Sequence, residues 1–205
     1  FYCKPNHYFN KKYGLNAVHS DLQYIYNTYL HNHQLIALDV GCSSGRKLLY
    51  FAAAGHSITG IDVNESAIEQ ISEISKKENL THVQTVIHDL NQPLNLKKEQ
   101  YNFVFSTVSL QFLKTECIHS LLNELQQATM KKGFHYMVFP IKSELYSLPA
   151  SFSFLPEKEE LYHLYQDSGW SILEYKESTG LLHKLDEFGR PLQGLFGNLL
   201  AQRIV

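Results

Sequence analysis

The sequence predicts an α/β protein with a mostly parallel sheet and helices on both of its faces. Short apolar runs alternate with segments of helical periodicity along most of the 205 residues. Parallel neighbours need a crossover connection, normally a right-handed one, so this alternation favours a parallel sheet covered on both sides. The last two apolar runs have no helical segment between them, which indicates a hairpin and one antiparallel strand at the end of the sheet.

The order of the elements follows from apolar spacing and from the positions of glycine and proline. Helices are expected at 17–32, from Gly45 onward, at 65–78, at 113–125 and at 157–169. Strands are expected at 35–41, 57–62, 82–89, 101–108, 134–140, 170–177 and 196–205. Serine and proline are frequent at 141–156, which favours a loop there.

The composition excludes several classes of protein. With 44% hydrophobic residues and a net charge of −2, the chain resembles an ordinary globular protein and has no field that would attract nucleic acid or an anionic membrane. No basic stripe with interleaved aromatic residues appears. The uncharged, apolar run 48–61 is too short to span a bilayer, which needs about 20 residues. Cys3, Cys42 and Cys117 form no CxxC pair, which argues against disulfides or a zinc site and favours a cytoplasmic location.

A turn with two glycines follows the first expected strand, in LDVGCSSGR at 38–46. Open α/β sheets bind ligands at the carboxyl ends of their strands. Gly41 and Gly45 allow the backbone to approach a ligand closely, and N–H groups at the start of the following helix can meet an acceptor. Taken alone, such a turn is equally compatible with a purely structural role.

Two acidic residues end the next two expected strands. Asp62 follows Gly41 by about 20 residues, a position from which a carboxylate accepts hydrogen bonds from both ribose hydroxyls. Asp89, in IHDLN, can accept one from the exocyclic amine of adenine. Each acid alone is also compatible with a structural role, Asp62 near a helix start and Asp89 in a turn. Because both follow strands of one predicted sheet edge, together they favour a nucleoside site.

The loop itself discriminates between nucleoside cofactors. A dinucleotide site favours GxGxxG, whereas this loop reads Asp39-x-Gly41-x-x-x-Gly45. A pyrophosphate would face Asp39 unfavourably, but a ligand that carries an ammonium and a sulfonium would be attracted by this carboxylate. The pattern therefore favours S-adenosylmethionine over the cofactor of a dinucleotide-dependent oxidoreductase.

Several segments carry a resemblance to a known family. The stretch 38–68, HDLN and STVSLQFL make the chain similar to class I S-adenosylmethionine-dependent methyltransferases. YFNKKYGLNAVHSD, SFSFLPEKEELYHLYQDSGW and GLLHKLDEFGRPLQGLFGNLLAQR extend the resemblance to the TehB-type tellurite-resistance methyltransferases over nearly the whole chain. The resemblance implies a Rossmann-like, seven-stranded sheet with a reversed last strand, and methyl transfer to tellurite and related chalcogen compounds.

The resemblance also implies which residues form the site. The expected cofactor-binding residues are Asp39, Gly41, Ser43, Gly45, Asp62, Val63, Asp89, Leu90, Ser106, Thr107 and Val108. The expected catalytic or substrate-positioning residues are His19, Arg46, His183, Lys184 and Arg190. A single domain would span 1–205, with a helical cover at 1–33 and active-site loops at 141–156 and 178–195. Without the resemblance, His183 would be taken to bond a loop carbonyl. Lys184 and Arg190 are equally compatible with solvated positions in a loop, and Arg46 with the surface of a helix.

Four positions depart from the family pattern. Ser43 stands where a second glycine is usual; it fits with a negative φ, whereas a left-handed conformation would cost about 1 kcal/mol. Lys47 replaces a common asparagine, and Lys184 replaces an arginine and so loses a bidentate fork for an oxyanion. The downstream family arginine is displaced by one position to Arg190.

The expected chemistry sets what the site must supply. Methyl transfer is an in-line displacement at carbon that depends on alignment and exclusion of water, and an oxyanion with a lone pair needs cationic positioning groups more than a strong base. Two alternatives remain: a methyltransferase for an organic hydroxyl or thiol, with His183 as general base, and a cofactor-binding protein without catalysis. The aromatic candidates for a lid are Tyr8, Phe9, Tyr13, Phe152 and Phe154.

Overall fold

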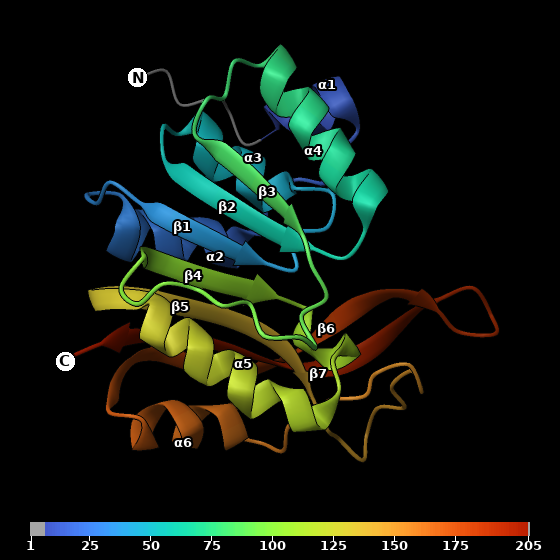
Figure 1. Ribbon diagram of the computed structural model, residues 1–205. Coiled ribbons are helices and arrows are strands. Elements are labelled where there is room, and N and C mark those ends of the chain that lie inside the picture. The colour runs from blue at the N-terminus through green and yellow to red at the C-terminus, as the bar shows by residue number, and fades with distance from the viewer. Residues whose placement is uncertain (1–6, 205) are drawn as a thin grey trace.

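A computed structural model describes residues 7–204, except for the side chain of His183. Its strands are β1 (Ile36–Val40), β2 (Ser57–Asp62), β3 (Val83–Ile87), β4 (Tyr101–Thr107), β5 (Thr129–Ile141), β6 (Trp170–Leu185) and β7 (Pro191–Arg203). They form one seven-stranded sheet in the order β3-β2-β1-β4-β5-β7-β6 (Figure 1). Only β7 runs antiparallel to its neighbours, β5 and β6, so the predicted Rossmann-like sheet with a reversed last strand is confirmed.

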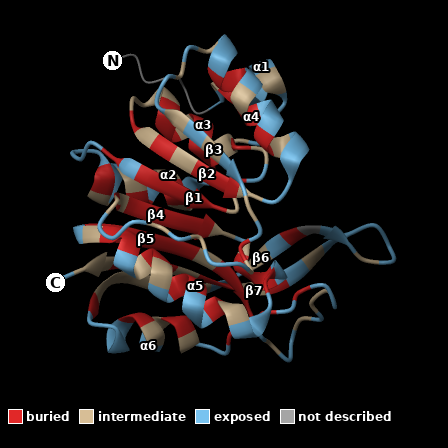
Figure 2. Ribbon diagram, viewed as in Figure 1, coloured by how far each residue is buried: buried red, intermediate tan, exposed pale blue. Residues whose placement is uncertain are grey.

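Helices cover both faces of the sheet, as predicted. They are α1 (Tyr8–Tyr13), α2 (Ser20–Ile25), α3 (Arg46–Ala53), α4 (Glu65–Lys77), α5 (Thr115–Ala128) and α6 (Glu160–Asp167). The first four pack on one face, where Phe103 and Phe105 join their apolar side chains, and α5 and α6 pack on the other, where Val104 lies. This division follows from the alternation of side chains along β4. Figure 2 shows that the central strands are buried, whereas the outer turns are exposed.

The N-terminal segment differs in detail from the expected helix at 17–32. Helix α2 begins at Ser20, because Nδ1 of His19 accepts a hydrogen bond from the Asp21 N–H at 3.2 Å and caps the helix. A π-helical turn at Tyr26–Leu30 then continues the chain to β1. Of the predicted cover at 1–33, residues 1–6 lie outside the described part. Every helix within 7–204 is too short or too polar to traverse a lipid bilayer.

The aromatic residues of α1 have structural contacts that the sequence did not indicate. The hydroxyls of Tyr8 and Tyr13 donate to the carboxylate of Glu78, just beyond α4, at 3.0 and 2.6 Å. Lys12 Nζ reaches the same carboxylate at 2.8 Å, and Phe9 is buried in the core. Helix α1 is therefore tied to the end of α4, and the interpretation of its aromatic residues as a lid is wrong.

The segment 178–195 is not an irregular loop, contrary to expectation. It forms the outer half of the β6–β7 hairpin, in which Gly180 pairs with Gly194 and Leu185 with Pro191. The turn is closed by Asp186, whose Oδ1 accepts hydrogen bonds from the N–H groups of Phe188 and Arg190. The hairpin therefore projects from the body as a two-stranded arm (Figure 1), whereas 142–159 carries neither helix nor strand.

A buried polar chain links β5 to α6. The side chain of His135 is fully buried, and its ring nitrogens bond the hydroxyls of Thr129 and Tyr165, each at 2.7 Å. The Trp170 ring packs against the imidazole at 4.4 Å between ring centroids. Burial lowers the pKa of His135 to about 3, so the ring is neutral in the folded protein at neutral pH.

This histidine makes stability depend on pH. Because its pKa is lowered on folding from about 6.5 to about 3, the unfolded chain binds a proton that the folded chain excludes. Above about pH 6.5 the ring is neutral in both states, and burying it does not lower the free energy of unfolding. As pH falls from there toward about 3, the free energy of unfolding decreases by up to about 1.4 kcal/mol per pH unit. We expect His135→Gln to flatten the fall in the free energy of unfolding between about pH 6.5 and 5, measured by denaturant titration. The exposed control His119→Gln should keep the wild-type slope; equal slopes for all three proteins would contradict the assignment.

Candidate functional site

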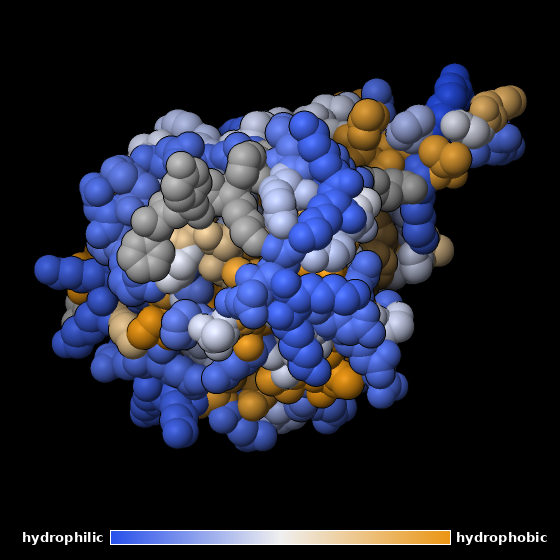
Figure 3. Space-filling view, turned by 90° about the horizontal axis from the view of Figure 1, so that it is seen from above, coloured by the Kyte–Doolittle hydropathy of each residue, from blue (hydrophilic) through white to orange (hydrophobic). Residues whose placement is uncertain are grey.

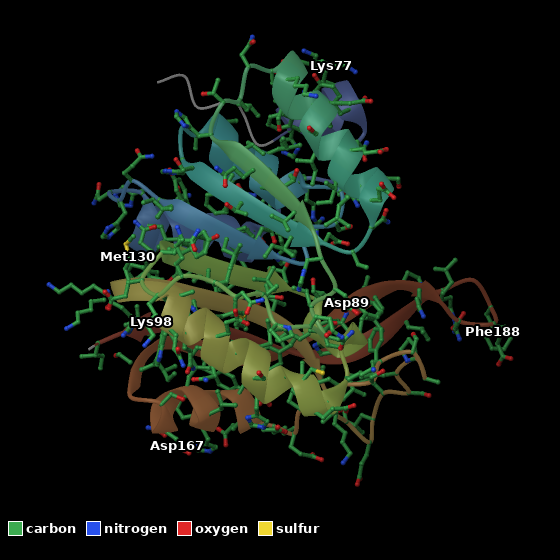
Figure 4. All side chains as sticks on the ribbon, viewed as in Figure 1. Lys77, Asp89, Lys98, Met130, Asp167 and Phe188 are labelled. Atoms are coloured by element: carbon green, nitrogen blue, oxygen red, sulfur yellow. The ribbon has the colours of Figure 1, made fainter. Side chains whose placement is uncertain are left out.

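A cavity of about 850 Å³ opens at the carboxyl ends of the parallel strands. Its walls come from the loops that follow β1, β2, β3 and β4, from α2 with the residues before it, and from the β6–β7 hairpin. In Figure 4 the labelled Asp89 lies on the side of the sheet from which the hairpin projects, whereas Lys98 and Met130 lie at the opposite end of the strands. The cavity is thus at the edge where open α/β sheets bind ligands.

The loop between β1 and α3 is shaped by residues with left-handed backbone. Gly41 has a φ of 79° and Gly45 a φ of 78°. A Cβ would lie 2.3 Å from Ser109 Oγ at Gly41 and 2.5 Å from an Ile71 side-chain carbon at Gly45, so neither position accepts a larger residue without displacement. Ser43 has a φ of 47°, so the chain adopts the costlier of the two conformations considered for it.

Asp62 holds this loop in place. Its Oδ2 accepts a hydrogen bond from the Ser43 N–H at 2.7 Å, and its Oδ1 accepts one from the Asn64 N–H at 2.9 Å. A carboxylate offers about four acceptor positions, so two stay available for the hydroxyls of a ribose. The carboxylate is therefore oriented by the protein itself, and Asp62 and Ser43 both line the cavity.

Asp89 is oriented in a similar way at the end of β3. Its Oδ1 accepts hydrogen bonds from the backbone and side-chain nitrogens of Asn91, both at 2.9 Å, and the backbone bond is the main cause that lowers the pKa of Asp89. This carboxylate is exposed and lines the cavity. Its second oxygen can accept a hydrogen bond from an amine such as that of adenine.

Apolar side chains line the same part of the cavity. Val63 is 68% exposed, Phe112 is 54% exposed, and Leu90 contributes a buried surface. Apolar surface beside two oriented carboxylates suits a flat aromatic base attached to a sugar, and the Phe112 ring is also packed edge-on against Phe152 at 5.3 Å between centroids. Phe112 was missed as a site residue, although the STVSLQFL segment contains it, because apolar spacing alone does not distinguish cavity walls from core.

The end of β4 carries backbone strain. Val108 is a β-branched residue with a φ of 57°, a conformation that such residues rarely adopt. Its N–H donates to the Val138 carbonyl at 2.7 Å, and its own carbonyl accepts from Gln111 Nε2 at 2.9 Å. Strained residues held by their surroundings cluster at ligand sites, and Val108 and Thr107 line this cavity.

Four of the predicted site residues do not line the cavity. These are Asp39, Gly45, Ser106 and Arg190. Asp39 is fully buried in β1, and within residues 7–204 neither of its carboxylate oxygens has a hydrogen-bond partner. Burial raises the pKa of Asp39 to about 7, against the opposing effect of Lys47. A buried carboxylate without a donor favours the approach of a cation, which fits a ligand that carries an ammonium group.

Basic side chains gather on the α2 and hairpin side of the cavity. Arg46 donates from Nη1 to the Ala17 carbonyl at 3.3 Å, and Lys184 donates from Nζ to Ser151 Oγ at 2.9 Å. Lys47 is nearly buried, with 8% of its surface exposed. All three line the cavity together with His19, whose ring caps α2. The cavity is therefore lined by both basic and acidic groups, and the acidic ones include Asp21 of α2 as well as Asp62 and Asp89.

Arg190 lies apart from this cluster. It is in the turn of the hairpin, where its Nε donates to Asp186 Oδ2 at 2.9 Å and its guanidinium stacks over the Phe188 ring. Figure 4 labels Phe188 at the tip of the arm, away from Asp89. The expectation that Arg190 contacts a substrate in the cavity is therefore wrong for this conformation, because Asp186 holds the side chain at the tip. The side chain of His183 lies outside the described part.

The segment 142–159 packs against the hairpin and closes one side of the cavity. Phe152 forms a small apolar cluster with Leu182 and Phe196, and all three line the cavity. Phe154, the other lid candidate of this segment, is instead buried in the core. Figure 3 shows apolar side chains on the projecting arm next to polar ones.

Comparison with known proteins identifies the family. The tellurite resistance protein TehB family matches residues 1–200. A probable S-adenosyl-L-methionine-dependent methyltransferase TehB from Haemophilus influenzae is 36% identical over 207 aligned residues, covering 99% of this chain and 68% of the relative. The chain belongs to the TehB family. Two relatives in this family are named probable S-adenosyl-L-methionine-dependent methyltransferases, and the chain is an enzyme of this class with S-adenosylmethionine as its cofactor.

Solved structures agree with this assignment. The crystal structure of TehB from Haemophilus influenzae superimposes with a TM-score of 0.87 at 34% identity, covering 97% of this chain and 66% of that one.

A further relative in sequence is a protein named Hemagglutinin 1 from Eikenella corrodens, with 30% identity over 204 residues, which cover 99% of this chain and 65% of that one. The chain thus spans about two thirds of the length of these TehB-like relatives.

Replacing Ser43 by glycine should relieve the strain in the TehB-family loop. We expect Ser43→Gly to raise the free energy of unfolding by about 1 kcal/mol, because only glycine adopts a left-handed φ without a steric cost. Ser43→Ala keeps the Cβ and should show no such gain. Urea denaturation of the three proteins measures the difference, and a destabilised Ser43→Gly protein would contradict this view of the loop.

Proposed function

We propose that this chain transfers a methyl group from S-adenosylmethionine to a small chalcogen oxyanion such as tellurite or selenite. The observation that carries the proposal is a single cavity lined both by two oriented carboxylates, Asp62 and Asp89, and by basic residues. A nucleoside cation fits the carboxylates and an anionic acceptor fits the basic residues. The name of the family, tellurite resistance protein, supports the same acceptor.

On the cofactor side, each group has a definite task. Asp62 would accept hydrogen bonds from the ribose hydroxyls, and Asp89 would accept one from the adenine amine. Val63, Leu90 and Phe112 would lie along the base. Asp39 would attract the ammonium group from behind the loop. When bound, S-adenosylmethionine supplies a methyl group on a positive sulfur, which an acceptor lone pair attacks while the electrons of the broken carbon–sulfur bond stay on the neutral thioether.

On the acceptor side, the protein positions the nucleophile and excludes water. Arg46, Lys47 and Lys184 supply positive charge to an oxyanion, and Phe152 with its apolar neighbours limits the access of water. Since a chalcogen(IV) oxyanion already has a lone pair, no residue has to remove a proton before transfer. The family resemblance assigns His183, whose backbone lies in β6, to this side as well.

A cytoplasmic location is part of the proposal. The described cysteines, Cys42 and Cys117, are free thiols, and Cys42 is buried beside the cofactor loop. Free thiols persist in a reducing compartment, where S-adenosylmethionine is also available.

Turnover tests the proposed acceptor directly. We expect the protein to convert S-adenosylmethionine to S-adenosylhomocysteine when selenite or tellurite is added, at a rate at least 10-fold above the rate without acceptor. Chromatography of the nucleoside product measures both rates. Turnover with a thiol or hydroxyl acceptor, but with neither oxyanion, would show that the acceptor is an organic compound and not a chalcogen oxyanion. Absence of turnover with every acceptor would favour a non-catalytic cofactor-binding protein.

A histidine variant tests the role of β6. We expect His183→Ala to reduce turnover by about 10² because a group that positions the acceptor is lost, with little change in the dissociation constant of S-adenosylmethionine. The matched control His163→Ala, on the exposed surface of α6, should leave both quantities unchanged. A loss of cofactor affinity without a loss of turnover would remove His183 from the acceptor side.

A further inference from the structure

Lys47 is an unusual residue for the wall of a ligand cavity. It is the second residue of α3 and lines the cavity, yet only 8% of its surface is exposed. Within residues 7–204 no carboxylate oxygen lies within 4.0 Å of its ammonium nitrogen, and that nitrogen donates no hydrogen bond to the protein. Its nitrogen is not among the fully buried polar atoms that lack a partner, so the small exposed part of Lys47 includes its charged end, which has little water and no carboxylate to compensate the charge.

The other basic residues of the cavity are already engaged. Arg46 donates to the Ala17 carbonyl and Lys184 donates to Ser151 Oγ. Both of these side chains are also more exposed than that of Lys47. Arg46 and Lys184 keep further donors, but among the described basic residues of the cavity Lys47 is the one whose charge is least screened by water. An anion that enters the cavity gains most from this group.

The nearest acidic influence on Lys47 comes from Asp39. The two groups attract each other, although burial outweighs this attraction and lowers the pKa of Lys47. Asp39 has no hydrogen-bond donor of its own within residues 7–204. In its ionised form, Asp39 both attracts the ammonium of Lys47 and repels any anion that approaches it. A ligand ammonium beside Asp39 would cancel that repulsion.

We propose that Lys47 binds the anionic methyl acceptor, and that the ammonium group of the cofactor, by neutralising Asp39, strengthens this binding. The inference rests on the proposed function and deepens it, since it names the residue that selects an oxyanion. Lys47 acts as a positioning and specificity residue, because it contacts the acceptor oxygens and takes no part in bond breaking. Binding of the two ligands is then coupled, and each ligand strengthens the binding of the other by the same factor.

Calorimetry with a product complex tests this assignment without turnover. S-adenosylhomocysteine carries the ammonium group but no transferable methyl, so selenite can be titrated into its complex with the protein. We expect Lys47→Gln to weaken selenite binding at least 10-fold, while the dissociation constant of S-adenosylhomocysteine changes less than threefold. That retained affinity also shows that the variant is folded. Lys98→Gln removes the same charge at the far end of the strands (Figure 4) and should leave both constants unchanged.

A second titration tests the coupling. Selenite should bind the wild-type protein about 5-fold or more tightly with S-adenosylhomocysteine present than without it. Asp39→Asn should reduce this difference, because the repulsive charge is then absent in both states. Equal selenite affinity with and without the nucleoside would contradict the proposed coupling.

Other outcomes separate this inference from the proposed function. Unchanged selenite affinity in Lys47→Gln, together with selenite turnover by the wild type, would overturn the inference and keep the function. A loss of S-adenosylhomocysteine affinity of 10-fold or more in Lys47→Gln would assign Lys47 to the cofactor carboxylate instead and would also overturn it. Failure of the wild type to bind S-adenosylhomocysteine would overturn the proposed function itself.

Discussion

The hydrogen bond between the Ser43 N–H and the Asp62 carboxylate fixes the part of the molecule on which the site depends. It joins the loop after β1 to the end of β2 at 2.7 Å, and the Asn64 N–H holds the other oxygen of the same carboxylate. The left-handed backbone of Gly41, Ser43 and Gly45 shapes the loop that receives this bond. One side chain therefore orients both a backbone cradle and its own remaining acceptor positions, before any ligand is bound.

Charge is distributed unevenly around the resulting cavity, and this distribution gives the two halves different chemistry. Asp62 and Asp89 are oriented by backbone donors, so they are ready to accept hydrogen bonds from a nucleoside. Lys47 and Asp39 are both buried, and the Lys47 ammonium nitrogen lies more than 4.0 Å from the Asp39 carboxylate oxygens. Each is costly to bury alone, so ligands of opposite charge stabilise them. The cavity thus favours a cationic cofactor and an anionic acceptor together.

The sequence predicted the sheet, its reversed last strand and the ligand-binding edge, because these depend on periodicity and on glycine and acid positions at strand ends. The sequence did not predict the features of the site that depend on tertiary contacts. Whether Asp39 faces a ligand or is buried depends on packing against α3, and Arg190 lies at the hairpin tip because Asp186 binds it there. The hairpin strands 178–185 and 191–195 read as loop because their glycines and charges are tolerated in an exposed arm. In the sequence, Lys47 was notable only as a departure from a family pattern, because the spacing of residues does not show that this side chain is buried.

The central claim is that this cavity binds a sulfonium nucleoside and not a dinucleotide. Isothermal titration of the protein with S-adenosylmethionine and, separately, with NAD tests it most directly. The account predicts saturable binding of S-adenosylmethionine at one site per chain, lost in Asp62→Ala, and no measurable binding of NAD at the same concentrations. Binding of NAD without binding of S-adenosylmethionine would contradict it.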